Sequence, residues 1–405
     1  MNPSSVPNSD RAIMLRYHEV ALKGDNRGWF EERLVINTRR LLSRALRTPE
    51  TPKPIINISK EHGRIIVHEP WSEPVGTALS RVFGLSGISP IRIVKTDKEE
   101  LIKAALEEFS EFVANNGLPK SFRVETRRSD KALPEKSMQL DYLIGGEIKD
   151  AYPELKVDLQ NPEFTLGVEI RFHHSFLWTK KYPGAGGLPA GTNGLVLALM
   201  SGGLDSPVAA IRALRRGCAV SFVHFYGVPF VGEESLTKVK DLVRLVNQYQ
   251  PEPLPLNVVP FGKIQEKIAL ATNPKLRTVI YRRMMIRIAE HLAQKLNAKA
   301  LVTGESIGQV ASQTLDNFST INAVAQLPII RPLACYDKEE IIAEARRWGT
   351  YETSIIPAAD CCTLFSDRHP SIRSTSQLTE EQEARFSVSE LVQEALTHIE
   401  THFDR

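Results

Sequence analysis

The sequence has few cysteines and no long apolar run, and both absences restrict the class of protein. Only 4 of its 405 residues are cysteine, and no Cys-x-x-Cys pair is present. The sequence therefore argues against a disulfide framework and gives no obvious set of ligands for a structural zinc site. No apolar stretch approaches the ~20 residues that span a bilayer, and the N-terminus lacks the apolar core of a signal peptide. We expect a cytoplasmic protein without a membrane segment.

An excess of charge of one sign is also absent. The 51 Lys and Arg residues nearly balance 48 Asp and Glu residues, and the formal net charge is +3. This value neither demands nor excludes a nucleic-acid partner, so a basic surface must be sought locally. A chain of 405 residues is long enough for two or three domains, each with its own core.

A glycine-rich turn follows an apolar run in the second half of the chain. Residues 195–200 are typical of a buried parallel strand, and Ser-Gly-Gly-Leu-Asp-Ser-Pro follows at 201–207. The glycines allow a tight turn, and Pro207 suits the first turn of a helix. The loop therefore offers backbone N–H groups, hydroxyls and a helix N-terminus to an anion, and phosphate is the simplest choice.

This loop lacks the lysine of the Walker pattern. Asp205 would repel a bare phosphate, so its position indicates a bridging Mg²⁺. The run resembles the PP-loop of the N-type ATP pyrophosphatases, which split ATP between its α- and β-phosphates and adenylate a substrate. A strand-to-helix turn that binds nothing is the simpler alternative.

Strand and helix patterns predict three domains in an α/β chain. We expect strands at 12–22, 55–59, 64–67 and 88–94 and helices at 29–46 and 75–83, the order of a ferredoxin-like unit. This N-terminal domain covers 1–75, or ends near 95 if the last strand belongs to it. The second domain, at 76–181, has helices from Asp97 and at 137–151 and strands at 121–125, 164–172 and 176–180.

A glycine- and proline-rich hinge at 182–191 opens the third domain, at 182–405. Strands at 196–200, 219–225, 255–259 and 300–303 alternate with helices at 207–216, 235–248, 278–296 and 338–348, and one last helix covers 388–403. This alternation predicts a doubly wound parallel sheet, in which ligands bind beyond the carboxyl ends of the strands.

A basic cluster lies in the second domain. Its members are Arg123, Arg127, Arg128, Lys131 and Lys136. The cluster has two interpretations, a solvated loop or a surface that binds phosphate groups of a nucleic-acid backbone.

Four further segments, in order, carry a resemblance that covers the chain from about Arg16. They are 16–27 (Arg-Tyr-His-Glu-Val-Ala-Leu-Lys-Gly-Asp-Asn-Arg), the hinge 182–191, 303–314 (Thr-Gly-Glu-Ser-Ile-Gly-Gln-Val-Ala-Ser-Gln-Thr), and 331–333 with 337–342. With the PP-loop, they resemble the ThiI-type tRNA 4-thiouridine synthetases. The resemblance implies a ferredoxin-like domain, a THUMP domain that binds the tRNA acceptor end, and a PP-loop ATP pyrophosphatase domain.

The family's reaction is then expected here. ATP adenylates O4 of uridine 8 in tRNA and releases pyrophosphate, and a persulfide or its sulfide equivalent attacks C4 and displaces AMP. The resemblance implies ATP and Mg²⁺ as cofactors, tRNA as partner, and a homodimer.

The resemblance also assigns roles to residues. Asp205 would organise Mg²⁺, and Lys338 would lie near the adenylated oxygen. The ATP contacts would be Leu199, Met200, Ser201, Gly202, Gly203, Ser206, His224, Phe225, Arg282, Gly304 and Gln313. Met200 and Phe225 as plain core residues, and Arg282 as part of a solvated cationic face, remain alternatives.

The segment Asp-Cys-Cys-Thr-Leu-Phe at 360–365 resembles the one that holds the family's acceptor cysteine. Cys362 occupies the matching position, and Cys361 stays open as the alternative. The chain after Phe365 has room for only a short helical tail, so we expect the form that lacks a rhodanese domain. The persulfide would then come from a cysteine desulfurase or a separate persulfide carrier.

Two other classes of function fit parts of the sequence. One is a PP-loop enzyme that adenylates a small molecule, against which the long region before the hinge argues. The other is an RNA-binding protein with an inactive loop, against which Asp205, Ser206 and Lys338 argue.

Overall fold

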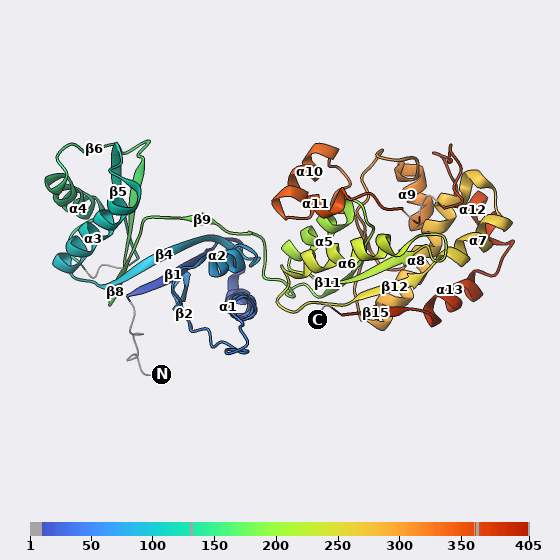
Figure 1. Cartoon of the computed structure of the whole chain (residues 1–405), viewed down its shortest axis with the longest axis horizontal. Helices are drawn as coiled ribbons and strands as arrows, with labels where there is room; N and C mark the ends of the chain where they lie inside the picture. The colour runs from blue at the N-terminus through green and yellow to red at the C-terminus, as the bar shows by residue number, and fades with distance from the viewer. Residues whose placement is uncertain (1–9, 130–132, 360, 362–363, 404–405) are drawn as a thin grey trace. The chain divides into compact units, whose positions relative to one another are not determined.

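The computed structural model describes residues 10–129, 133–359, 361 and 364–403. The chain forms two compact units, Met1–Gly186 and Gly187–Arg405, and each has its own β-sheet (Figure 1). The division falls inside the predicted hinge at 182–191. No helix in the described ranges is long and apolar enough to cross a membrane.

The first half of the first unit has the predicted ferredoxin-like order, which confirms this part of the fold class. Its elements are β1 (Arg11–Tyr17), α1 (Arg27–Ala45), β2 (Ile58–Glu61), β3 (Arg64–Val67), α2 (Glu73–Ser80) and β4 (Leu85–Lys95). The strands lie in the order β2-β3-β1-β4, and β1 pairs antiparallel with both neighbours. The apolar face of α1 buries Leu34, Leu41 and Leu42.

The predicted strand at 12–22 is too long. β1 ends at Tyr17, and residues Glu19–Leu22 and Gly24–Asn26 form 3-10 turns instead. Gly24 has a φ of +51°, which reverses the chain before α1 and is a conformation that glycine adopts without strain. Val20 is apolar because it packs into the core from the first turn, and not because it belongs to a strand.

The second half of this unit continues the same sheet. Its elements are α3 (Lys98–Asn116), β5 (Ser121–Arg128), α4 (Ser137–Ala151), β6 (Lys156–Val157), β7 (Phe164–Ile170), β8 (His174–Trp178) and β9 (Tyr182–Pro183). Strand β4 joins the halves, because β1 lies along one edge and β8 and β9 pair with the other. The boundary at residue 75 therefore stays a prediction.

The second unit holds a sheet in the order β14-β13-β10-β11-β12-β15, in which all but β15 are parallel. The strands are β10 (Leu195–Leu199), β11 (Ala219–Tyr226), β12 (Leu256–Pro260), β13 (Leu301–Val302), β14 (Ile329–Ile330) and β15 (Glu400–His402). The helices are α5 (Asp205–Arg215), α6 (Glu233–Asn247), α7 (Gly262–Ala271), α8 (Arg277–Lys295), α9 (Leu315–Asn322), α10 (Lys338–Arg347), α11 (Tyr351–Ser354), α12 (Ser376–Glu383) and α13 (Val388–Thr397).

Helices cover both faces of this sheet, as predicted for a doubly wound domain. Helices α5 and α6 pack together with α10 and α11, whereas α8 packs with α7, α9, α12 and α13 (Figure 1). The predicted helix at 388–403 is wrong at its end, because α13 stops at Thr397 and β15 pairs antiparallel with β12. This pairing covers the edge that β12 would otherwise expose.

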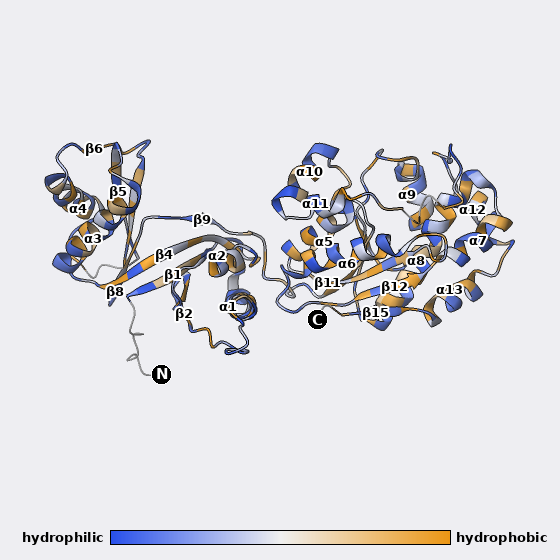
Figure 2. Cartoon of the chain, viewed as in Figure 1, coloured by the Kyte–Doolittle hydropathy of each residue, from blue (hydrophilic) through white to orange (hydrophobic). Residues whose placement is uncertain are grey.

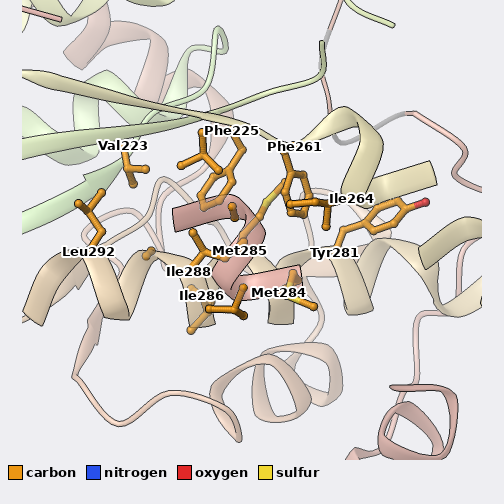
Figure 3. Close-up of a cluster of buried hydrophobic side chains, with 14 of the residues drawn as sticks. Val223, Phe225, Phe261, Ile264, Tyr281, Met284, Met285, Ile286, Ile288 and Leu292 are labelled. Carbon is orange, nitrogen blue, oxygen red and sulfur yellow. The ribbon is translucent and has the colours of Figure 1, made fainter. Parts of the chain in front are cut away.

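A hydrophobic core of the second unit lies between α8 and the sheet. In Figure 3, Met285 and Ile288 of α8 lie toward Phe225 and Leu292 lies toward Val223, and each of these side chains is at least nine-tenths buried. Hydrophobic residues follow β11 and β12 along their length, whereas α10 is mostly hydrophilic (Figure 2). This core fixes α8 beside the ends of β10 and β13, where the candidate site lies.

Candidate functional site

The carboxyl ends of β10, β11 and β13 border a cavity of about 280 Å³ in the second unit. Every residue predicted to contact ATP lines it except Gly202. The lining residues that were not predicted include Met285, Ile286, Thr303, Glu305, Gln309, Val310 and Ile321. The parallel topology explains the convergence, because such strands present their carboxyl ends at one edge of the sheet.

The glycine-rich loop closes on itself through two serines. The Ser201 N–H donates to Ser206 Oγ at 3.0 Å, and the Ser206 hydroxyl donates to the Ser201 carbonyl at 3.1 Å. The Gly203 N–H donates to Ser201 Oγ at 3.3 Å. The loop's own hydrogen bonds therefore define its shape directly ahead of the first turn of α5.

Gly304 lies against that first turn. A Cβ added at Gly304 would be 2.6 Å from Ser206 N and 2.7 Å from the Asp205 carbonyl carbon. Both contacts are with backbone, which cannot move aside as a flexible side chain can. Only glycine fits this close approach between the end of β13 and the start of α5.

Both carboxylate oxygens of Asp205 are engaged by other side chains. Lys338 Nζ, at the start of α10, lies 2.7 Å from Oδ1, and Gln309 Nε2 donates to Oδ2 at 2.8 Å. Two predicted residues 133 positions apart thus meet in one ion pair. Gln309 lies within the segment 303–314 that carried the resemblance, but nothing in its residue type indicated this contact.

The residues around Asp205 fit a Mg²⁺ ion that arrives with a nucleotide. Within the described residues, no group of three or more His, Cys, Asp or Glu side chains could form a protein cage for a metal. Mg²⁺ commonly uses one or two carboxylates and completes its shell with phosphate oxygens and water. Asp205 beside the loop supplies one such carboxylate.

Glu305, the second carboxylate of the cavity, is only 6% exposed and belongs to a buried network. It forms ion pairs with Arg282 and with Arg331, whose Nε lies 2.7 Å from Oε2, and Thr303 Oγ1 donates to Oε2 at 2.9 Å. Burial alone would raise the pKa of the Glu305 carboxyl, but the two guanidinium groups and the hydrogen bonds outweigh it and lower the pKa.

The network explains why Arg282 differs from its neighbours on α8. Arg283, only 1% exposed, and Arg287 both form ion pairs with Glu383 of α12. Arg282 lines the cavity and pairs with Glu305. The alternative of one solvated cationic face therefore does not describe these three residues.

Two further cavity residues have distinct polar contacts. His224 Nδ1 lies 2.9 Å from the Met200 carbonyl, which ties the ends of β11 and β10 together. Gln313 is 6% exposed, and its Oε1 accepts no hydrogen bond from the described part of the chain. Since a buried acceptor without a donor is costly, Gln313 offers a bonding position to an N–H group of a ligand.

One cysteine of the predicted pair lines the cavity. Cys361 is 8% exposed, and its carbonyl accepts a hydrogen bond from Gln265 Nε2 at 2.8 Å. Cys362 lies outside the described residues. Burial raises the pKa of the Cys218 thiol, which suits an unreactive position.

In the first unit, the members of the basic cluster differ in their contacts. Arg128 donates to the Glu135 and Leu133 carbonyls, each at 2.7 Å, so it holds its own loop in place. Arg123 donates to the Leu159 carbonyl at 3.1 Å. Arg127 pairs with Glu125 at 2.7 Å but remains 62% exposed, and Lys136 is exposed. Lys131 lies outside the described residues.

Comparisons with known proteins agree with this architecture. The family described as Thiamine biosynthesis protein (ThiI) matches residues 191–388, the ThiI ferredoxin-like domain matches 12–89, and the THUMP domain matches 95–179. A probable tRNA sulfurtransferase of Brevibacillus brevis is 40% identical over 96% of this chain and 95% of the relative. The chain belongs to the ThiI family.

Further comparisons agree with this assignment. A probable tRNA sulfurtransferase of Moorella thermoacetica is 39% identical over 96% of each chain. A 4-thiouridine synthetase, solved in complex with RNA and with bound ATP, has a TM-score of 0.87 and 35% identity over 97% of this chain and 99% of its own. A Pyrococcus horikoshii protein has a TM-score of 0.66 and 25% identity over 84% of this chain and 99% of its own.

In this ThiI chain, Glu305→Gln should weaken both the fold and nucleotide binding. The substitution removes the charge that compensates the partly buried Arg282 and Arg331, so the free energy of unfolding should fall by about 3 kcal/mol at neutral pH. Urea denaturation measures this loss, and titration with ATP should show a higher Kd. Glu339→Gln, at an exposed position in the first turn of α10, is the matched control.

The pH dependence of the same variant gives a second readout. Because the pKa of folded Glu305 is depressed, its stabilising effect is complete above the ordinary Glu pKa and is lost as the pH falls through the folded-state value. The stability difference between wild type and Glu305→Gln should therefore shrink in acid. A difference that stays constant from pH 7 to the acid limit of folding would contradict the assigned charge.

Proposed function

We propose that this chain is an ATP-dependent tRNA uridine 4-sulfurtransferase. It adenylates O4 of uridine 8 in tRNA and then replaces this oxygen with sulfur. The observation that carries the proposal is the ion pair of Asp205 with Lys338 beside a self-closed glycine-rich loop and a cavity. The relatives named probable tRNA sulfurtransferases, and the similar synthetase solved with RNA and ATP, support the choice of substrate.

The cavity and the loop divide the binding of ATP between them. The adenosine would occupy the cavity, where Gln313 Oε1 and Arg282 offer polar contacts and Met285 and Phe225 offer apolar ones. The phosphates would lie on the loop N–H groups ahead of α5. Mg²⁺, when bound, would be held by Asp205 and phosphate oxygens and would offset the charge of the departing pyrophosphate.

Lys338 supplies the cation for adenylation. Its ammonium group already lies beside Asp205, so an oxygen that approaches the nucleotide's α-phosphate near this aspartate meets a positive charge. Negative charge grows on the phosphoryl oxygens during the transfer, and a preplaced cation lowers the energy of that state. The oxygen of the uracil carbonyl becomes part of AMP, a far better leaving group than oxide.

The sulfur step falls to Cys362, and Cys361 stays open as the alternative carrier. The terminal sulfur of a cysteine persulfide bonds to C4, and the C4–O4 bond breaks as AMP leaves with its electron pair. A second thiolate then attacks the cysteine's own sulfur, the S–S bond breaks, and its electrons stay on the sulfur bound to C4. The resulting disulfide is reduced by an external thiol. A cysteine desulfurase or a separate persulfide carrier loads the cysteine.

Asp205→Asn should abolish adenylation and spare tRNA binding. The amide keeps the size of the side chain but loses the charge that attracts Lys338 and a metal ion, so tRNA-dependent pyrophosphate release should fall by about 10²–10³-fold. Filter binding should give an unchanged Kd for tRNA. Asp316→Asn, an exposed aspartate in the first turn of α9, should behave as wild type. Full turnover by Asp205→Asn would remove this aspartate from the mechanism.

Cys362→Ser should stop sulfur transfer and spare adenylation, because a hydroxyl cannot hold a persulfide. With a desulfurase and cysteine as sulfur source, nucleoside mass spectrometry should detect no 4-thiouridine, while pyrophosphate release continues. Free sulfide should restore the product. Cys361→Ser is the matched control and should retain most activity, and the reverse pattern would assign the carrier role to Cys361.

Arg127→Ala should weaken tRNA binding in a salt-dependent way. Arg127 is the most exposed arginine of the basic cluster whose contacts are with a side chain rather than with its own loop. Loss of one phosphate contact lowers the slope of log K against log salt by ~0.7–0.9. Arg47→Ala, at an exposed position after α1, is the control. An unchanged slope for Arg127→Ala would mean that this arginine belongs to a solvated face.

A further inference from the structure

We propose that Lys238 is a positioning residue for sulfur transfer, which holds the segment carrying Cys361 against the glycine-rich loop. The inference rests on the proposed function, in which this segment supplies the sulfur. It assigns a role to a lysine that no part of the adenylation site requires.

The described residues between α11 and α12 are held by side chains from three helices. Each of them donates a hydrogen bond to a backbone carbonyl of the segment. The pairs are Lys238 Nζ to Ile356 at 2.6 Å, Ser235 Oγ to Ala359 at 3.0 Å, Gln265 Nε2 to Cys361 at 2.8 Å, and an Arg277 guanidinium nitrogen to Phe365 at 2.9 Å. The position of Cys361 is thus set by α6, α7 and α8, and these contacts lie on both sides of it in sequence.

Lys238 differs from the other donors because it is a lysine that is only 8% exposed. Lysine is rarely buried, because its ammonium group loses hydration on burial and must be paired within the protein. Its place on α6 is one turn after Ser235, so these two residues face the segment together. A buried lysine on α6 therefore indicates that this position requires a hydrogen-bond donor for a reason other than the stability of the helix.

The stem of Lys238 also lies against the glycine-rich loop. A Cβ added at Gly202 would be 3.5 Å from Lys238 Cδ and 3.9 Å from its Nζ. One side chain therefore contacts the loop that would bind the phosphates and the segment that would carry sulfur.

The stem and the ammonium group of Lys238 make different contacts, so a substitution can remove one and keep the other. The apolar stem packs on the loop, whereas the ammonium group binds the Ile356 carbonyl. Loss of the ammonium alone should loosen the segment and leave the loop packed. A displacement of a reacting group by about 1 Å can cost ~10²-fold in rate, so the sulfur step should suffer and adenylation should not.

Lys238→Met tests this inference in the full-length chain. Methionine keeps an unbranched stem against Gly202 but cannot donate to Ile356. We expect tRNA-dependent pyrophosphate release within about twofold of wild type, and persulfide-dependent 4-thiouridine formation reduced by about 10–10²-fold. Free sulfide should restore the product, because it does not need the segment in place. Lys238→Arg, which retains a donor, should recover part of the loss, and Lys240→Met on the same helix is the matched control.

Three outcomes would overturn the inference. If pyrophosphate release and thiolation fall equally, Lys238 belongs to the nucleotide site. If thiolation falls as much with free sulfide as with persulfide, the substitution has damaged the protein generally. If neither rate changes, Lys238 has no role in the reaction. If Lys238→Met does not fold, Ser235→Ala removes a neighbouring contact from the same helix and should give the same pattern with a smaller loss. A wild-type protein that forms no 4-thiouridine would instead refute the proposed function itself.

Discussion

The close approach of Gly304 to the first turn of α5 is the constraint on which the rest of the site depends. The absence of a side chain there lets the end of β13 lie against the backbone of Asp205 and Ser206. The chain that continues from Gly304 then brings Glu305 to Arg282 and Gln309 to Asp205. A larger residue at 304 would clash with this backbone and push the two halves of the site apart.

Each carboxylate of the site is paired with at least one cationic side chain. Asp205 is balanced by Lys338, and Glu305 is balanced by Arg282 and Arg331. A cavity with paired charges can fold without a ligand, because no buried carboxylate or guanidinium group is left alone among these five residues. On binding, a metal ion would pair with Asp205 and the nucleotide phosphates would pair with Lys338, in place of the ion pair between these two side chains.

Patterns local in sequence predicted most of the fold, and contacts distant in sequence were missed. The order of strands and helices followed from apolar periodicity, and the loop at 201–207 followed from its glycines and its aspartate. The strand at 12–22 was too long because Val20 anchors a turn, and the helix at 388–403 was too long because β15 covers the edge of β12. Glu305, Gln309 and Lys238 escaped prediction because their partners, Arg282, Asp205 and Ile356, lie 23, 104 and 118 positions away.

Strand β4 gives the first unit a property that its two domain-like halves would not have separately. Arg92 pairs with Arg11 of β1 on one edge and with Leu177 of β8 on the other. A slip of one residue in β4 would turn its buried side chains to the opposite face for both halves at once. The ferredoxin-like half and the THUMP half therefore share a single register, and any change in the pairing of β4 would alter both.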